Sequence, residues 1–152
     1  MKHRPMSWCF AVVAAAVVSG IAWNWRAERT ADIVVYRTPS CECCLRWADH
    51  LRNSGFSVYV RTQEHVDSVR ARYGVPGRLS SCHTARVGPY TVEGHVPAQD
   101  IRRLLAERPP IVGLSVPGMP IGSPGMEQGN RHDAYAVLAF DEDGRTQVFA
   151  QH

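Results

Sequence analysis

The order of apolar patterns limits the fold more than any other feature of this 152-residue sequence. The run Asp32–Arg37 is β-branched and typical of a buried strand, and a Thr-Pro-Ser break follows it. Residues 45–51 then carry an apolar face at helical spacing, and residues 56–60 alternate as a second strand. Two strands joined by a helix lie parallel in one sheet, because the crossover returns the chain to the same end. The sequence therefore predicts an α/β fold.

The later patterns add further strands and helices to this unit. They predict a short helix in residues 66–73, a hairpin in 84–96, a helix opened by Pro97, and a second hairpin formed by residues 135–140 and 146–149. Short connections favour one central mixed sheet with flanking helices and a C-terminal hairpin. Sites in open α/β sheets lie at the carboxyl ends of strands, which is where the first strand meets its helix.

The segment Ile111–Asn130 shows no periodicity. It holds five glycines and three prolines, yet it also contains apolar residues that a disordered linker would lack. A long loop without regular structure inside a compact domain is usually functional. We interpret this segment as an ordered flap folded back over the site.

The first 30 residues have the pattern of an export signal. A short basic stretch precedes an uncharged, mostly apolar run from Cys9 to Trp23, and small residues before position 23 suit cleavage after Ala22. The alternative is an uncleaved anchor at the lower length limit of a membrane span. We expect residues 1–30 to be a signal peptide or N-terminal membrane anchor plus a short linker. Residues 31–152 then form one domain in the periplasm, in contact with a membrane only through an uncleaved leader.

The charge of the exported part excludes several functions. Two of the 17 basic residues, Lys2 and Arg4, precede the apolar run, so 15 basic residues face 14 acidic ones beyond it. The arginines are interleaved with acids and form no basic stripe, which argues against nucleic-acid binding. The sequence has no paired acid/base carboxylates, phosphate-binding glycine loop or Ser-His-Asp order. We assign no catalytic residues, and a binding protein is favoured over an enzyme.

The strongest chemical feature is the cluster Cys41-Glu42-Cys43-Cys44. Three thiols follow a strand and open a helix, where the free backbone N–H groups stabilise thiolate. A soft metal is the favoured ligand of such a cluster. Thiol-disulfide exchange by Cys41 and Cys44 is an alternative, and a structural disulfide is another in an oxidising compartment.

Two further elements carry sulfur or nitrogen donors. Cys82-His83 precedes a strand expected beside the first strand, which would bring the pair near the cluster, although a single cysteine beside a histidine is usually a buried thiol. Met119 and Met126 lie among glycines and prolines and not on an apolar face, where methionine is ordinary core filler. Thiolate, imidazole and thioether together select Cu(I). Three cysteines and one histidine also suit structural zinc. His95 is either a further donor or a buried core histidine.

These motifs resemble a bacterial family catalogued as DUF411. The resemblance extends from about Ile33 to Phe149 and rests on the segments 36–44, 74–76, 81–85, 92–97, 113–120, 122–126 and 135–140. It implies a periplasmic copper-resistance protein with a thioredoxin-like fold. It also implies a set of copper ligands: Cys41, Cys43, Cys44, Cys82, His83, Met119 and Met126. Family members often have glycine where this chain has Glu42, which adds a negative charge near the thiolates.

The implied fold gives Cys82-His83 a specific role. In thioredoxin-like oxidoreductases, a cis-proline loop faces the Cys-x-x-Cys motif at the position that Ser81–Thr84 occupies here. We expect Cys82-His83 to replace that substrate-positioning loop with metal ligands. The seven donors exceed the needs of one tetrahedral ion, so we expect Cu(I), in more than one copy, and exchange with other periplasmic copper-handling proteins.

Overall fold

The computed structural model describes residue 28 and residues 30–152, so the expected leader lies almost entirely outside the described residues. The chain divides into two units between Ala31 and Asp32, and the second unit, Asp32–His152, carries every strand named below. Within the described part of the chain, no helix combines the length and apolar character needed to cross a membrane.

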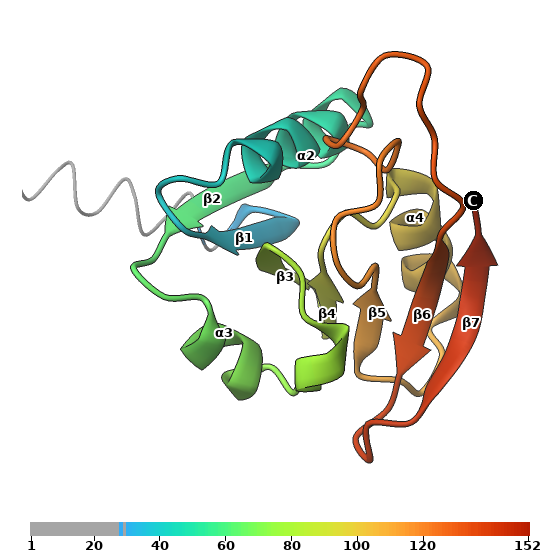
Figure 1. The fold of residues 1–152 in the computed structure, drawn as a ribbon. Helices are drawn as coiled ribbons and strands as arrows, with labels where there is room; N and C mark the ends of the chain where they lie inside the picture. The colour runs from blue at the N-terminus through green and yellow to red at the C-terminus, as the bar shows by residue number, and fades with distance from the viewer. Residues whose placement is uncertain (1–27, 29) are drawn as a thin grey trace, which may run out of the picture. The chain divides into compact units, whose positions relative to one another are not determined.

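The second unit is built on one seven-stranded mixed sheet (Figure 1). Its strands are β1 (Ile33–Arg37), β2 (Val58–Thr62), β3 (His83–Val87), β4 (Tyr90–Glu93), β5 (Gly113–Ser115), β6 (Ala136–Phe140) and β7 (Thr146–Gln151). The helices are α2 (Glu42–Asn53), α3 (Asp67–Arg72) and α4 (Ala98–Glu107), with a 3-10 turn at Gly77–Leu79. The strand order is β2-β1-β3-β4-β5-β6-β7.

The strand directions confirm the predicted crossover and hairpins. The pair β1–β2 is parallel, with Val35 beside Val60, and α2 forms the connection. The pairs β3–β4 and β6–β7 are antiparallel hairpins, as predicted, and β3 is antiparallel to β1. The α/β class and the mixed sheet are therefore confirmed. The thioredoxin-like assignment stays an expectation.

The prediction that residues 111–130 lack regular structure was wrong at one point. Residues 113–115 form β5, which lies inside the sheet between β4 and β6. Three residues are too few to show a two-residue period, so neighbouring strands and not local sequence define this strand. A side chain at Gly113 would collide with the carbonyl oxygen of Thr91, 1.8 Å from the ideal Cβ position. Only glycine therefore allows this close strand pairing.

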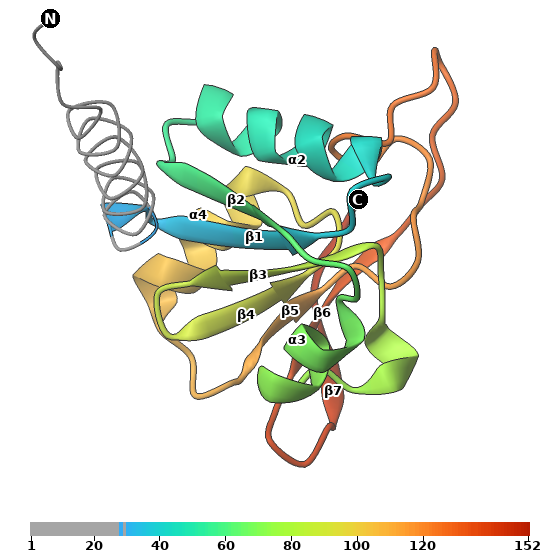
Figure 2. The same ribbon diagram turned by 90° about the vertical axis from the view of Figure 1, so that its left-hand side faces the viewer.

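The sheet has a larger and a smaller core on its two faces. Ile33 and Val35 point to the face covered by α2 and α4, where Trp47 and Ile101 are completely buried. The alternate residue Tyr36 points to the other face and packs against α3. Figure 2 shows α3 on the opposite side of the sheet from α2. Alternation along β1 thus fixes which helix covers which face.

The outer strand β7 is protected from pairing with other strands. Its register against β6 shifts between Val137 and Leu138, which places a bulge in the hairpin. Arg103 of α4 donates a hydrogen bond to the carbonyl oxygen of Phe149, and its guanidinium lies 3.8 Å from the centre of that ring. Bulges and charged side chains are common ways to blunt an exposed sheet edge.

Candidate metal centre

The cysteine cluster lies where β1 turns into α2. Cys41 is the residue before the helix, and its backbone N–H donates to the carbonyl oxygen of Thr38 at 3.2 Å. Arg37 at the end of β1 donates to the carbonyl oxygen of Cys41 at 2.7 Å. These bonds hold the turn, so the three sulfur atoms of the motif lie at the start of α2.

The sulfur atoms of the motif lie close to Cys82. Cys41 and Cys44 form a disulfide, while Cys43 and Cys82 are free. The Cys43 sulfur lies 3.5 Å from the Cys41 sulfur and 3.8 Å from the Cys82 sulfur, although 39 positions separate Cys43 and Cys82 in the chain. The four cysteines form one group whose ligand atoms lie within 4.8 Å of one another. The expected convergence of Cys82 on the cluster is confirmed.

Two histidines extend the cluster on its other side. The Cys82 sulfur lies 3.3 Å from Nδ1 of His83 and 3.0 Å from Nε2 of His95. Nδ1 of His95 donates to the carbonyl oxygen of Pro124 at 2.8 Å, so the proton of the neutral ring sits on Nδ1 and Nε2 presents a lone pair to Cys82. Cys82, His83 and His95 thus form a second group of candidate ligands that shares Cys82 with the first.

His83 is completely buried beneath Trp47 of α2, with ring centres 4.3 Å apart. The Trp47 indole donates to the carbonyl oxygen of Val96 at 2.9 Å, which fixes the ring against which His83 packs. Nε2 of His83 is buried and has no hydrogen-bond partner among the described residues. An unpaired buried nitrogen is costly, whereas Nδ1, the other ring nitrogen, faces the Cys82 sulfur.

Burial keeps both histidines neutral and Cys82 protonated. Burial lowers the pKa of His83 far below its usual range and also lowers the pKa of His95. Burial, and then the nearby Cys43, raise the pKa of the Cys82 thiol to about 12. Neutral imidazole is the form that binds metal, whereas a bound cation must displace the Cys82 proton.

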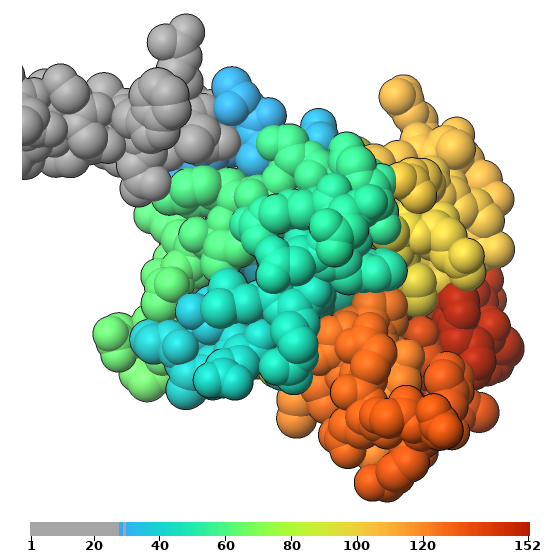
Figure 3. Space-filling view, turned by 90° about the horizontal axis from the view of Figure 1, so that it is seen from above, coloured from blue at the N-terminus to red at the C-terminus, as the bar shows by residue number. Residues whose placement is uncertain are grey.

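The flap approaches the start of α2, as predicted (Figure 3). The Arg46 guanidinium donates to the carbonyl oxygen of Gly125 at 2.9 Å. A Cβ on Gly125 would lie 2.8 Å from the Cys43 carbonyl oxygen and 2.8 Å from the Trp47 nitrogen. Met126 is the next residue in the chain and is half-buried, and its backbone N–H donates to the carbonyl oxygen of Ser123 at 2.8 Å.

Met119 lies at a second contact of the flap. The backbone N–H of the preceding residue, Gly118, donates to the carbonyl oxygen of Ser80 at 3.2 Å, and the Ser81 hydroxyl donates to the Gly118 carbonyl oxygen. The Met119 side chain is 52% exposed. Flap backbone therefore reaches the residues just before Cys82, and Met119 stands at the solvent side of that contact.

The donor chemistry fits a soft metal ion. The two ligand groups consist of cysteine sulfurs and histidine imidazoles, without a carboxylate. Thiolate and imidazole favour Cu(I) and zinc over hard ions such as calcium or magnesium. The described residues therefore provide a site able to hold a soft metal.

Comparison with known proteins agrees with this chemistry. A family profile described as "Protein of unknown function, DUF411" matches residues 79–126. A solved structure of copper resistance protein CopG, Form 2, is 46% identical with a TM-score of 0.76, covering 79% of this chain and 96% of that one. The Form 1 structure is also 46% identical, with a TM-score of 0.75 and coverage of 79% and 95%. The chain belongs to the family of copper resistance protein CopG. No curated protein sequence matches it.

The predicted resemblance to DUF411 is thus confirmed, and the CopG structures match most of the described domain. His95 is the candidate ligand absent from the predicted set. Its position could be suspected from Gly94-His95 at the end of a predicted strand, but not its orientation. That orientation depends on Gly94, whose φ of +73° turns the chain after β4.

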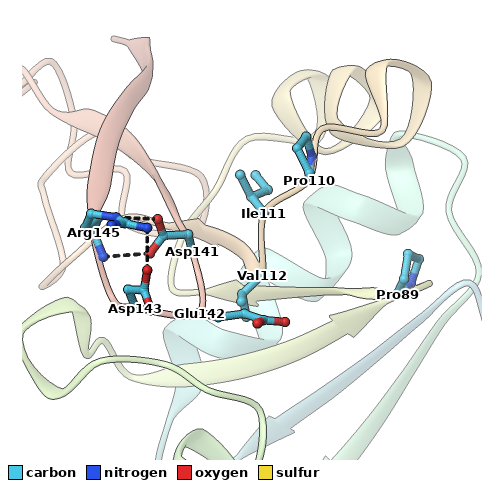
Figure 4. Close-up of a pocket in the computed structure, with 8 residues that line it drawn as sticks. All are labelled: Pro89, Pro110, Ile111, Val112, Asp141, Glu142, Asp143 and Arg145. Atoms are coloured by element: carbon cyan, nitrogen blue, oxygen red, sulfur yellow. Dashed lines mark hydrogen bonds and ion pairs between the residues drawn. The ribbon is translucent and has the colours of Figure 1, made fainter.

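A surface pocket of about 660 Å³ lies apart from the CopG-family cysteines (Figure 4). It is lined by Pro89, residues 110–112, residues 141–143 and Arg145. Arg145 is already paired with Asp141 at 2.9 Å and with Asp143, so its charge is satisfied within the turn. None of the predicted ligands lines this pocket.

Proposed function

We propose that this CopG-family chain is an exported periplasmic protein that binds copper and sequesters or transfers Cu(I). The observation that carries the proposal is the 3.8 Å distance between the sulfur atoms of Cys43, at the start of α2, and Cys82, just before β3. His83 and His95 lie beside Cys82. The name of the matched structures, copper resistance protein, supports copper as the metal.

The proposed ligands are Cys41, Cys43, Cys44, Cys82, His83, Met119 and Met126, to which the geometry adds His95. Four donors satisfy one tetrahedral ion, so this set supports more than one Cu(I). The shared position of Cys82 between the two ligand groups suits a sulfur that bridges ions. Met119, which is exposed, would bind at the solvent side, where an ion enters or leaves.

Full occupancy requires reduction of the Cys41–Cys44 disulfide. Two electrons and two protons convert this disulfide into two thiols. Cu(I) then displaces thiol protons as it binds, as metal ions do at cysteine sites. The reductant is a dithiol or another thiol donor of the compartment, and it is oxidised to a disulfide.

Anaerobic titration of the reduced full chain with Cu(I) tests the proposal. We expect tight binding of more than one ion, a lower stoichiometry in Cys82→Ser, and loss of tight binding when Cys41, Cys43 and Cys44 are all changed to Ser. The exposed His65 lies outside the ligand groups, so His65→Ala is a matched control that keeps the wild-type stoichiometry. Zinc that displaced Cu(I), or unchanged copper binding in Cys82→Ser, would contradict the proposal.

A thiol-disulfide or copper-redox oxidoreductase is the second candidate, because the structure contains the Cys41–Cys44 disulfide at a helix start. A thioredoxin-like fold is supported by the parallel β1–β2 crossover and by the 3.6 Å distance between the Cys44 sulfur and the Cys82 carbonyl oxygen. An insulin-reduction assay set beside the copper titration separates the two functions. Catalytic turnover without tight copper binding would favour the oxidoreductase over the copper-binding protein.

Export is proposed from residues 1–30 alone. Cleavage after Ala22 would release the domain into the periplasm, whereas an intact leader would hold it at the inner membrane. N-terminal sequencing of the protein from the periplasmic and membrane fractions distinguishes these outcomes. Recovery of the intact chain from the cytoplasm would contradict export.

A further inference from the structure

A buried ion pair between Arg70 and Glu93 contacts the residue that precedes Cys82, the cysteine that both ligand groups share. The Glu93 side chain is completely buried at the end of β4, and its Oε1 accepts a hydrogen bond from Nε of Arg70 at 2.9 Å. Arg70 belongs to α3, on the face of the sheet opposite α2. A buried carboxylate is expensive unless it is paired and hydrogen-bonded. Replacing a buried ion pair by apolar side chains of similar volume is often neutral or stabilising. Stability alone therefore does not explain this pair, and its hydrogen-bond partners indicate its role.

Those contacts are made on both sides of Cys82-His83. Oε1 of Glu93 accepts the backbone N–H of Ser81 at 2.7 Å, and Arg70 donates to the Ser81 carbonyl oxygen at 2.8 Å. Oε2 of Glu93 accepts the hydroxyl of Thr84 at 2.6 Å. The residues immediately before and after the Cys82-His83 pair are therefore held by one carboxylate.

The two residues after Glu93 complete the arrangement. Gly94 donates its backbone N–H to the His83 carbonyl oxygen at 3.0 Å. A Cβ on Gly94 would lie 2.5 Å from the Ser81 hydroxyl oxygen, so the absence of a side chain lets Ser81 approach. His95 then reaches the Cys82 sulfur at 3.0 Å. Each residue of the tripeptide 93–95 therefore has its own contact with the Cys82 segment. Glu93 binds Ser81 and Thr84, Gly94 leaves space for Ser81, and His95 contacts Cys82.

We infer that Glu93 and Arg70 are positioning residues that set Cys82 and His83 for metal binding, an inference that rests on the proposed copper function. Neither side chain is itself a ligand. The fork of Arg70 binds Glu93 and Ser81 together, so it joins α3 to the metal centre across the sheet. Hydrogen-bond partners of metal ligands commonly change metal affinity by about 10- to 100-fold when they are lost.

The test compares variants of the full chain that keep the fold. Glu93→Gln removes the charge, Arg70→Lys removes the fork, and Thr84→Val removes one donor while keeping the side-chain shape. Asp100→Asn is the matched control, because Asp100 is also a buried carboxylate, 4% exposed, but pairs with the C-terminal His152 at 2.7 Å. Circular dichroism identifies the variants that are folded at the assay temperature. In those, Cu(I) affinity is measured by competition with a chromophoric chelator and Cys82 alkylation by peptide mass spectrometry.

We expect Glu93→Gln and Arg70→Lys to lower Cu(I) affinity about 10- to 100-fold and to speed alkylation of Cys82 in the reduced, metal-free chain. We expect Asp100→Asn to change neither, and Thr84→Val to show a smaller shift in the same direction. Wild-type affinity and alkylation in folded Glu93 and Arg70 variants would overturn the inference, as would equal shifts in Asp100→Asn. The alkylation rate needs no copper. It therefore decides the positioning role even if the wild-type chain binds no Cu(I) and the proposed function fails.

Discussion

Gly125 controls how closely the flap can approach the metal centre. Its φ of +86° is a conformation that side chains rarely adopt, and the space where a Cβ would sit is filled by backbone atoms of Cys43 and Trp47. Backbone atoms of a helix cannot move aside as a flexible side chain can. This position therefore requires glycine for two independent reasons, conformation and space.

We predict that Gly125→Ala lowers the free energy of unfolding by about 1–3 kcal/mol more than Gly129→Ala does. Gly129 also has a positive φ, +58°, but nothing lies within 4 Å of its Cβ position, so its variant reports conformational strain alone. Urea denaturation of both variants measures the difference. Equal losses of stability would show that the flap moves away at little cost.

The contacts of Cys82 differ in how well the sequence predicts them. The approach of Cys82 to the Cys41–Cys44 cluster could be predicted, because a strand beside β1 brings its first residues to the end of β1. The sequence offered the contact of His95 with Cys82 only as one of two alternatives. This contact depends on the turn at Gly94 and on the Pro124 carbonyl, which selects the ring nitrogen that faces the sulfur.

Helices α2 and α4 are joined by a histidine outside the metal centre. Nε2 of His50, near the end of α2, accepts the backbone N–H of Ala98 at 3.2 Å, where α4 begins. Burial lowers the pKa of His50, because the charged form loses solvation. Protonation would also place a positive charge at the N-terminus of α4, where the helix dipole disfavours it.

This contact predicts that stability falls on acidification. The folded-state pKa of His50 lies below its unfolded value of about 6.5, so the unfolded chain binds the proton more readily. The contribution of neutral His50 to the free energy of unfolding is complete above the unfolded-state pKa. It is lost as the pH falls through the lower, folded-state pKa. We expect His50→Gln, which keeps an acceptor but does not titrate, to lose less stability between pH 7.5 and 5.5, measured by urea denaturation. An identical pH dependence in both proteins would contradict the role of His50.

The strands differ in how well their sequences predict them. β1 and the two hairpins have apolar residues at strand spacing, bounded by glycine or proline, and local pattern was sufficient. β5 lacks such a pattern, because its three residues are fixed by pairing with β4 on one side and β6 on the other. A strand defined by its neighbours has no local signal to find.

The proposed metal joins segments that are far apart in the chain. The two ligand groups draw on the start of α2, the start of β3 and the turn after β4. An ion held by all three binds the folded chain more tightly than the unfolded one, so binding adds to stability.

We therefore predict that Cu(I) raises the melting temperature of the reduced chain. Free Cu(I) held at 100 times its dissociation constant adds about 2.7 kcal/mol to the free energy of unfolding. Anaerobic thermal melts in a Cu(I)-buffered solution measure the shift, and the variant with Ser at positions 41, 43 and 44 is the control without strong binding. A wild-type melting temperature that did not respond to Cu(I) would show that the ion does not connect these segments.

The spacing of the donors also has a consequence in time. A chain made from its N-terminus presents Cys41, Cys43 and Cys44 well before Cys82, His83 and His95 have been synthesised. At that stage the strand β3, which pairs with β1 in the folded domain, does not yet exist. The complete donor set that we propose for the metal therefore forms only once β3 and the turn after β4 have folded beside the start of α2.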